Sequence, residues 1–120
     1  MEKESNKMVN DENKEFRMEI ILDTTGDTAN FRVKGEIDTK SGVELSDRFA
    51  DVMQNEAIYH VCFDFTEVPN ITSAGIGKIL KLFKFMNSKG GSIRIRGISA
   101  SLKDLFCEIH LDKIIPIEEK

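Results

Sequence analysis

Ser73 is the residue whose surroundings best fit a chemical role. It lies in the run 69–77, where a hydrophobic stretch ends and an amphipathic pattern begins, so its hydroxyl falls at the predicted N-terminus of a helix. The first turn of a helix leaves backbone N–H groups without intrahelical partners, and the helix dipole adds partial positive charge there. A phosphate group is well accommodated at such a position, and Gly75 and Gly77 keep the approach open.

Other chemical motifs fail on their spacing. Gly75 and Gly77 begin a dinucleotide-binding pattern, but Leu80 stands where the third glycine belongs, and the phosphate-binding loop pattern also fails around Lys78. The two histidines and two cysteines form neither a metal-ligand set nor a nucleophile with a base. The sequence therefore predicts no metal, no cofactor and no enzymatic activity.

Glu36 and Asp38 form a pair of carboxylates at the end of a predicted strand. On their own they are typical of solvated or helix-capping residues. Binding sites in α/β proteins gather beyond the carboxyl ends of the strands, and both this loop and the segment of Ser73 leave such ends. If the fold brings them together, the pair either contacts the metal-bound nucleotide of a partner kinase or orients the loop.

Size and composition indicate one globular domain. The chain has 120 residues, of which 40% are hydrophobic and 32% charged, and a net charge of −4 argues against nucleic-acid binding. No apolar stretch is long enough to span a membrane and the N-terminus is charged, so we expect a cytoplasmic protein. Cys62 and Cys107 lie among apolar residues and are predicted to be reduced, buried thiols.

The hydrophobic pattern divides the chain into a polar tail at 1–14 and a domain at 15–120. Strands are predicted at 16–23, 29–33, 58–65, 92–96 and 114–117, with the third covered on both faces. Helices are predicted to begin after Asp38, Thr39 or Ser41, after Ser73, and after Ser99 or Ser101. Their predicted inward residues are, in chain order, Leu45, Phe49, Val52 and Met53; Ile76, Ile79, Leu80 and Phe83; Leu102, Leu105, Phe106 and Ile109. The order ββαβαβαβ favours an α/β fold, with a mixed, mostly parallel sheet of about five strands packed against helices.

These residues together resemble a known family. The matching segments are Gly35-Glu36-Ile37-Asp38, Asp64-Phe65 before 71–77, Gly90-Gly91, and Leu111-Asp112-Lys113-Ile114. They resemble the STAS domain of bacterial anti-sigma factor antagonists over most of the chain, from residue 16 to 117. The central motif is moderately specific, because its spacing, order and flanking elements agree together.

The resemblance implies a binding protein with a switch. Members of this family bind an anti-sigma factor that is itself a serine kinase, and so release a sigma factor for transcription. Phosphorylation of the motif serine, which aligns with Ser73, ends the binding, and a metal-dependent phosphatase restores it. Many members have Asp before that serine, whereas this chain has Thr72, which becomes a second candidate acceptor.

The same resemblance and the residue pattern define a predicted partner-binding surface. Phe85 falls almost opposite the predicted inward side of its helix, between Lys78 and Lys81, and is predicted to contact the partner, although single exposed apolar residues are also common. The alternative function is a STAS scaffold or transporter-associated module that binds without phosphorylation. The full predicted surface is Glu36, Asp38, Thr72, Ser73, Ala74, Gly75, Ile76, Lys78 and Phe85.

Overall fold

The elements follow the predicted order. A computed structural model describes residues 18–120, so the predicted tail at 1–14 and the predicted domain start at residue 15 lie outside the described residues. The elements are β1 (Glu19–Thr25), β2 (Thr28–Lys34), α2 (Thr39–Met53), β3 (His60–Glu67), α3 (Ser73–Ser88), β4 (Ser92–Ile98), α4 (Ala100–Glu108), the 3-10 helix η1 (Leu111–Lys113) and β5 (Ile117–Glu119).

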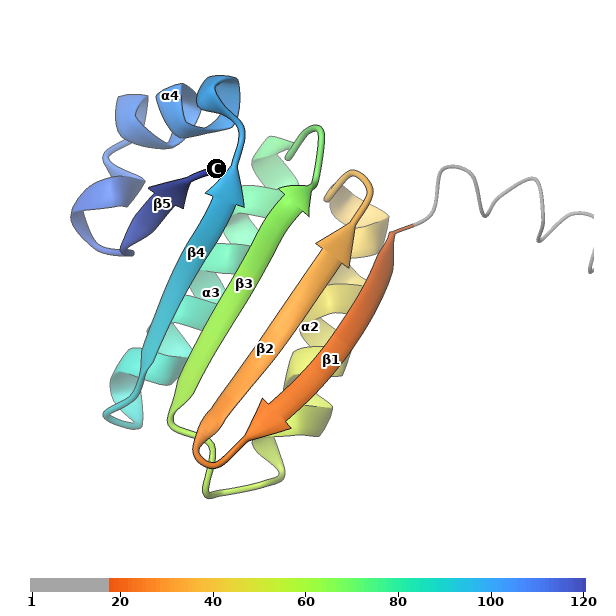
Figure 1. Cartoon of the computed structure of the whole chain (residues 1–120), viewed down its shortest axis with the longest axis vertical. Coiled ribbons are helices and arrows are strands. Elements are labelled where there is room, and N and C mark those ends of the chain that lie inside the picture. Colours follow the sequence, from red (N-terminus) through yellow and green to blue (C-terminus); the bar gives the residue numbers. More distant parts are fainter. Residues whose placement is uncertain (1–17) are drawn as a thin grey trace, which may run out of the picture.

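The five strands form one mixed sheet in the order β1-β2-β3-β4-β5. β1 and β2 form an antiparallel hairpin whose two-residue turn contains Gly26, and the remaining neighbours are parallel. The strand order never reverses, and the successive β-α-β crossovers place α2 and α3 side by side on one face of the sheet (Figure 1). The predicted mixed, mostly parallel sheet is confirmed.

The prediction that β3 is covered on both faces is wrong. On one side Val61, Phe63 and Phe65 are buried, whereas on the other side only Cys62 is buried and His60 and Thr66 are exposed. Because α2 and α3 occupy the same side, neither covers the opposite side of this strand (Figure 1). The sheet therefore has an open, polar face, on which Arg94 and Arg96 are exposed.

The helices that cover the sheet have clear start and stop signals. Asp38 caps α2 in a capping box with Ser41, and Thr72 and Ser99 cap α3 and α4. After α3 the chain turns at Gly90, which has a φ of 83°. These caps agree with the predicted boundaries, and they select Asp38 and Ser99 among the candidates.

The buried side of α3 differs from the predicted one. Its fully buried residues are Gly75, Ile79, Leu82 and Met86, whereas the other predicted inward residues are only half-buried. The predicted inward stripe is rotated about the helix axis away from the side that faces the sheet, toward the flank opposite Phe85. Ile76, Leu80 and Phe83 occupy that flank.

The C-terminal part contains three further corrections. Ile109 is 45% exposed, because α4 ends at Glu108 and the backbone turns at His110 with a left-handed φ of 64°. The last strand comprises Ile117–Glu119 and does not begin at residue 114. Cys107 is exposed because it lies outside the buried side of α4, whereas Cys62 is buried as predicted; both are free thiols.

Candidate functional site

The junction between β3 and α3 presents one exposed hydroxyl and one that is already bonded. Ser73 is the first residue of α3, and Thr72 is its N-cap. Thr72 Oγ1 accepts a hydrogen bond from the N–H of Gly75 at 3.2 Å and donates to the carbonyl oxygen of Ile37 at 3.4 Å. The Ser73 side chain is exposed, and no hydrogen bond to its hydroxyl comes from any residue between 18 and 120.

The loop after β2 lies directly beside this junction. The N–H of Ile37 donates to the carbonyl oxygen of Asn70 at 3.1 Å, and the N–H of Thr72 donates to the carbonyl oxygen of Ile37 at 2.9 Å. These bonds form an isolated parallel bridge between Ile37 and Ile71. The fold thus brings the loop of Glu36 and Asp38 next to Ser73, which is the arrangement that a functional role for these carboxylates requires.

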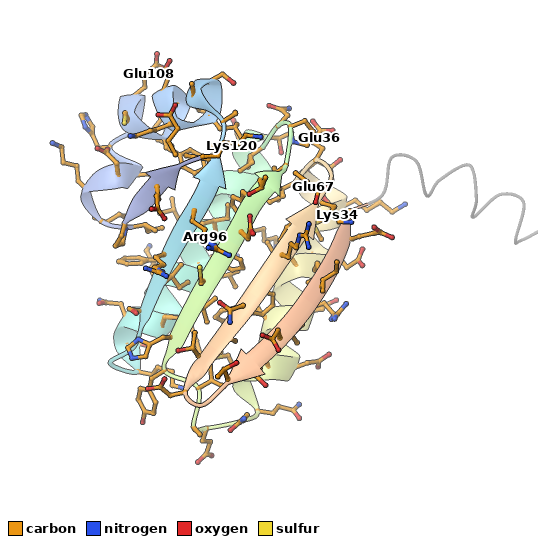
Figure 2. The ribbon with its side chains drawn as sticks, viewed as in Figure 1. Lys34, Glu36, Glu67, Arg96, Glu108 and Lys120 are labelled. Carbon is orange, nitrogen blue, oxygen red and sulfur yellow. The ribbon has the colours of Figure 1, made fainter. Side chains whose placement is uncertain are left out.

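Both carboxylates make hydrogen bonds that hold this loop. Glu36 Oε2 accepts from the side-chain amide of Asn70 at 2.7 Å, which links the two loops at the end of the sheet where Figure 2 labels Glu36. Asp38 Oδ1 accepts from the N–H of Ser41 at 2.9 Å. Hydrogen bonds from the N–H and hydroxyl of Ser41 hold the pKa of Asp38 below its usual value. These contacts support loop orientation as the role of the pair.

Gly75 allows the two loops to approach so closely. A Cβ added at this position would overlap the carbonyl oxygen of Ile37 and would lie 2.9 Å from Ile37 Cγ2. Glycine is unfavourable within a helix, and its presence in the first turn of α3 is a sequence signal for such close approach. Asn70, by contrast, carries no comparable signal, because its importance comes from contacts that only the folded chain creates.

Phe85 lies on the flank of α3 that faces α2. Its side chain is 46% exposed, as predicted, but its ring also packs edge-on against Phe49, with centroids 5.9 Å apart and an interplanar angle of 85°. Phe85 therefore lies beside the helix pair rather than directly opposite the buried side of α3. Lys78 extends from the same helix over Gly42 of α2.

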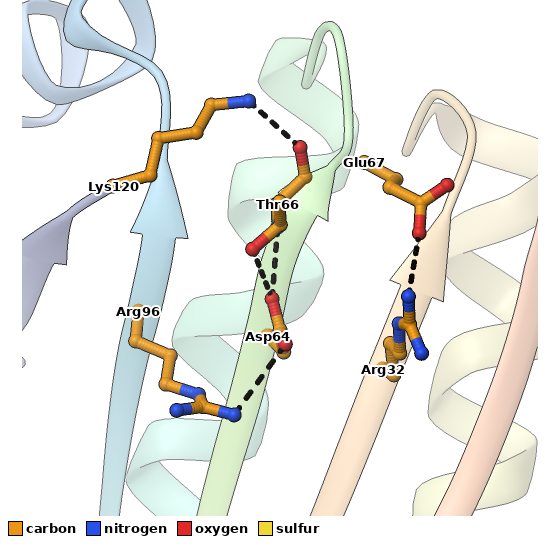
Figure 3. Close-up of polar contacts among 6 residues, drawn as sticks. All are labelled: Arg32, Asp64, Thr66, Glu67, Arg96 and Lys120. Carbon is orange, nitrogen blue, oxygen red and sulfur yellow. Dashed lines mark hydrogen bonds and ion pairs between the residues drawn. The ribbon is translucent and has the colours of Figure 1, made fainter.

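The open face of the sheet carries a second, separate polar group of residues. Asp64 Oδ1 accepts from the Thr66 hydroxyl at 2.6 Å, and Asp64 Oδ2 lies 3.5 Å from Arg96 (Figure 3). Partial burial raises the pKa of Asp64, but the hydrogen bonds from Thr66 and the Arg96 guanidinium outweigh this effect and lower it. Arg32 pairs with Glu67 at 3.0 Å on the same face.

The described residues show neither a metal-ligand cluster nor a membrane-spanning helix. Within residues 18–120, no group of three or more His, Cys, Asp or Glu side chains is placed to hold a metal ion. No helix in this part of the chain is long and apolar enough to cross a membrane.

Comparisons with known proteins agree with the geometry. The sequence of residues 19–120 matches the family model of the STAS domain. The anti-sigma-B factor antagonist of Bacillus subtilis is 30% identical over 88 residues, which cover 73% of this chain and 79% of that protein.

Solved structures share the fold at lower sequence identity. An anti-sigma factor antagonist from Mycobacterium paratuberculosis matches with a TM-score of 0.74 and 16% identity, covering 86% of each chain. The Bacillus cell fate determinant SpoIIAA in its phosphorylated form matches with a TM-score of 0.67 and 17% identity, covering 82% of this chain and 90% of that one. Family match, sequence identity and fold agree: this chain belongs to the STAS domain proteins of the bacterial anti-sigma factor antagonist family.

Proposed function

We propose that this chain binds an anti-sigma factor of the serine-kinase type, and that phosphorylation of Ser73 ends the binding. The observation that carries the proposal is the exposed Ser73 hydroxyl at the N-terminus of α3. By occupying the anti-sigma factor, the chain releases a sigma factor for transcription, and a metal-dependent phosphatase resets the switch. The Bacillus subtilis relative and the Mycobacterium paratuberculosis structure are both named as anti-sigma factor antagonists, which supports this role.

Ser73 is a better acceptor than Thr72 on structural grounds. Transfer of a phosphoryl group needs a hydroxyl oxygen that a kinase can reach. Thr72 is half-buried and its hydroxyl oxygen caps α3, so modification of that oxygen would break the cap as well as the bond to Ile37. The Ser73 hydroxyl can be modified without loss of either contact.

A phosphate at Ser73 would change the charge of the surface more than its shape. It adds a charge of about −1.5 to −2 and three acceptor oxygens at a helix N-terminus, where backbone N–H groups and the helix dipole favour an anion. Glu36 and Asp38 already place two carboxylates on the neighbouring loop. The added dianion makes this end of the molecule strongly negative and repels acidic groups of a partner.

The predicted partner-binding residues then form one surface. Glu36 and Asp38 contribute from the loop before α2, and the start of α3 contributes the exposed and half-buried residues between Thr72 and Lys78. Gly75, although predicted for this surface, is buried against Ile37 and is not part of it. Phe85 extends this surface along the exposed flank of α3. The partner therefore binds at the end of the domain where the loops after β2 and β3 meet.

The test combines phosphopeptide mapping with binding titrations. The chain is incubated with ATP and the kinase-type anti-sigma factor of its own genome, and we expect one phosphate, located at Ser73. Ser73→Asp should weaken binding of that factor at least tenfold, whereas Ser73→Ala should bind like the wild type. Ser101→Asp is the matched control, since Ser101 is also exposed in the first turn of a helix, α4.

Two results would contradict the proposal. Phosphate found only at Thr72 or elsewhere would remove Ser73 as the acceptor. Stable binding without any phosphate transfer would favour the alternative of a constitutive scaffold.

A further inference from the structure

A groove runs between α2 and α3, on the side of the helices away from the sheet core. It has a volume of about 380 Å³ and is lined mostly by apolar side chains. The ring of Phe85 forms one wall, and its edge-on contact with Phe49 forms part of the floor. The lining residues used below are Phe49, Ala50 and Met53 of α2, and Lys81, Leu82 and Phe85 of α3.

The α3 side of the groove is positively charged. α3 contains three lysines, Lys78, Lys81 and Lys84, and no acidic residue, although the chain as a whole has a net charge of −4. Positions 78, 81 and 85 follow one another at helical spacings of three and four, so Lys78 and Lys81 share the flank of Phe85. An apolar floor therefore lies beside a row of cations in an otherwise acidic protein.

We propose that this groove binds an amphipathic helix with carboxylates along one flank, contributed by the anti-sigma factor. This inference rests on the proposed function, because it names a second contact of the same partner. An apolar groove between two helices accepts apolar side chains spaced at i, i+3, i+4 and i+7, and the lysines attract an acidic flank. A pairing that set α3 against α3 of a second copy is disfavoured, because it would bring the same lysines against one another.

The groove is separate from the phosphorylation site on the same helix. Phe85 follows Ser73 by twelve residues, which corresponds to about 18 Å along a helix at 1.5 Å per residue. A partner that fills the groove can also reach Ser73, but a phosphate on Ser73 does not enter the groove. The phosphate therefore acts at the helix N-terminus and does not change the groove itself.

The first experiment uses a synthetic probe and does not need the anti-sigma factor. An 18-residue amphipathic helix of leucine and glutamate is titrated into the ¹⁵N-labelled full chain and followed by amide chemical shifts. A second peptide has lysine in place of every glutamate. We expect shifts at Phe49, Met53, Lys81 and Phe85, and an affinity at least tenfold higher for the acidic peptide, which falls as salt is raised.

Charge reversal locates the binding. Lys81→Glu should weaken the acidic peptide about tenfold, and Lys113→Glu, a reversal of an exposed lysine in η1, should have no effect. Ser73→Asp should also leave the peptide affinity unchanged. Equal affinity for both peptides, or shifts confined to the open face of the sheet, would overturn the inference. A tenfold gain in peptide affinity on removal of residues 1–17 would also overturn it, by identifying that segment as the occupant.

Titrations with the anti-sigma factor separate this inference from the proposed function. If the wild type and Lys81→Glu bind the factor equally, the groove inference fails while the proposed function stands. If the factor neither binds the wild type nor phosphorylates it, the proposed function fails. Selective binding of the acidic peptide in the groove would then still support the chemistry assigned to this surface.

Discussion

Gly75→Ala tests whether the contact between α3 and Ile37 sets the geometry of the site. In an ordinary helix position this change stabilises a protein, because alanine has a higher helix propensity than glycine by about 1 kcal/mol. Here the new methyl group overlaps the carbonyl oxygen of Ile37 and lies 2.9 Å from Ile37 Cγ2. That carbonyl oxygen also accepts the N–H of Thr72 at 2.9 Å, so it cannot move without straining the bridge between the loops.

The expected magnitude follows from these opposing effects. Forcing a methyl group into a closely packed site costs about 1–3 kcal/mol, which is reduced by the propensity gain of about 1 kcal/mol. The free energy of unfolding should therefore fall by up to about 2 kcal/mol, equivalent to a Tm lowered by up to roughly 10 °C for a domain of this size, rather than rise as at an ordinary helix position. Urea titration followed by circular dichroism measures the difference directly.

Gly77→Ala is the matched control on the same helix. A Cβ at Gly77 meets no atom within 4 Å, and the residue is exposed. This variant should gain about 0.5–1 kcal/mol of stability. If Gly75→Ala were equally stabilising, the close approach of α3 to the loop after β2 would be refuted, and the assembly of the candidate site would need another explanation.

Three further results are expected. In the native protein, a thiol reagent should label Cys107 but not the buried Cys62. Labelling of Cys107 should require a higher pH than labelling of a cysteine in an unfolded peptide, since desolvation and the Asp112 carboxylate raise the pKa of Cys107. Labelling of Cys62 at the same rate would contradict its burial. The pKa of Asp38 is lowered in the folded state, so the contribution of this carboxylate to stability is complete above its unfolded pKa and is lost as pH falls through its folded pKa. Below about pH 4, the stability of Asp38→Ala should therefore fall less steeply than that of the wild type. Urea titrations at several pH values would show this difference. A double-mutant cycle on the exposed pair of Arg32 and Glu67 should give a coupling below about 1 kcal/mol that shrinks with salt, and a larger, salt-independent value would be inconsistent with a solvated ion pair.

The elements of this fold were predictable because local signals agreed with one another. Alternating residues marked β1, β2 and β4, a short run of β-forming residues marked β3, and Asp38, Thr72 and Ser99 each stand where an N-cap is needed. The order of strands and helices then left few topologies to consider, because β-α-β crossovers have a fixed hand. The position of Ser73 at a helix N-terminus followed from the same signals.

What could not be predicted depends on how the elements pack. The sequence of β3 is apolar enough for a strand covered on both faces, and only the placement of α2 and α3 on one side shows that it is not. Leu82 and Met86 face the sheet because of the rotation of α3 about its axis, which periodicity alone fixes only approximately. A glycine in the first turn of α3 signals that some segment approaches closely there, but no local pattern identifies Ile37, far away in the chain, as that segment.

Phosphorylation of Ser73 should leave the fold intact, and this separates a surface switch from an unfolding switch. A dianion at a helix N-terminus contributes about 0.3–1 kcal/mol of stability, and repulsion from the carboxylates on the neighbouring loop offsets part of this gain. The backbone around Ser73 is held by the bond from Thr72 to Ile37 and by the cap on Gly75, neither of which involves the serine hydroxyl. In urea titrations, the free energies of unfolding of the phosphorylated and unmodified chains should thus differ by no more than about 1 kcal/mol. Their affinities for the anti-sigma factor should differ at least tenfold. Loss of several kcal/mol on phosphorylation would show instead that the modification acts by disrupting the first turn of α3.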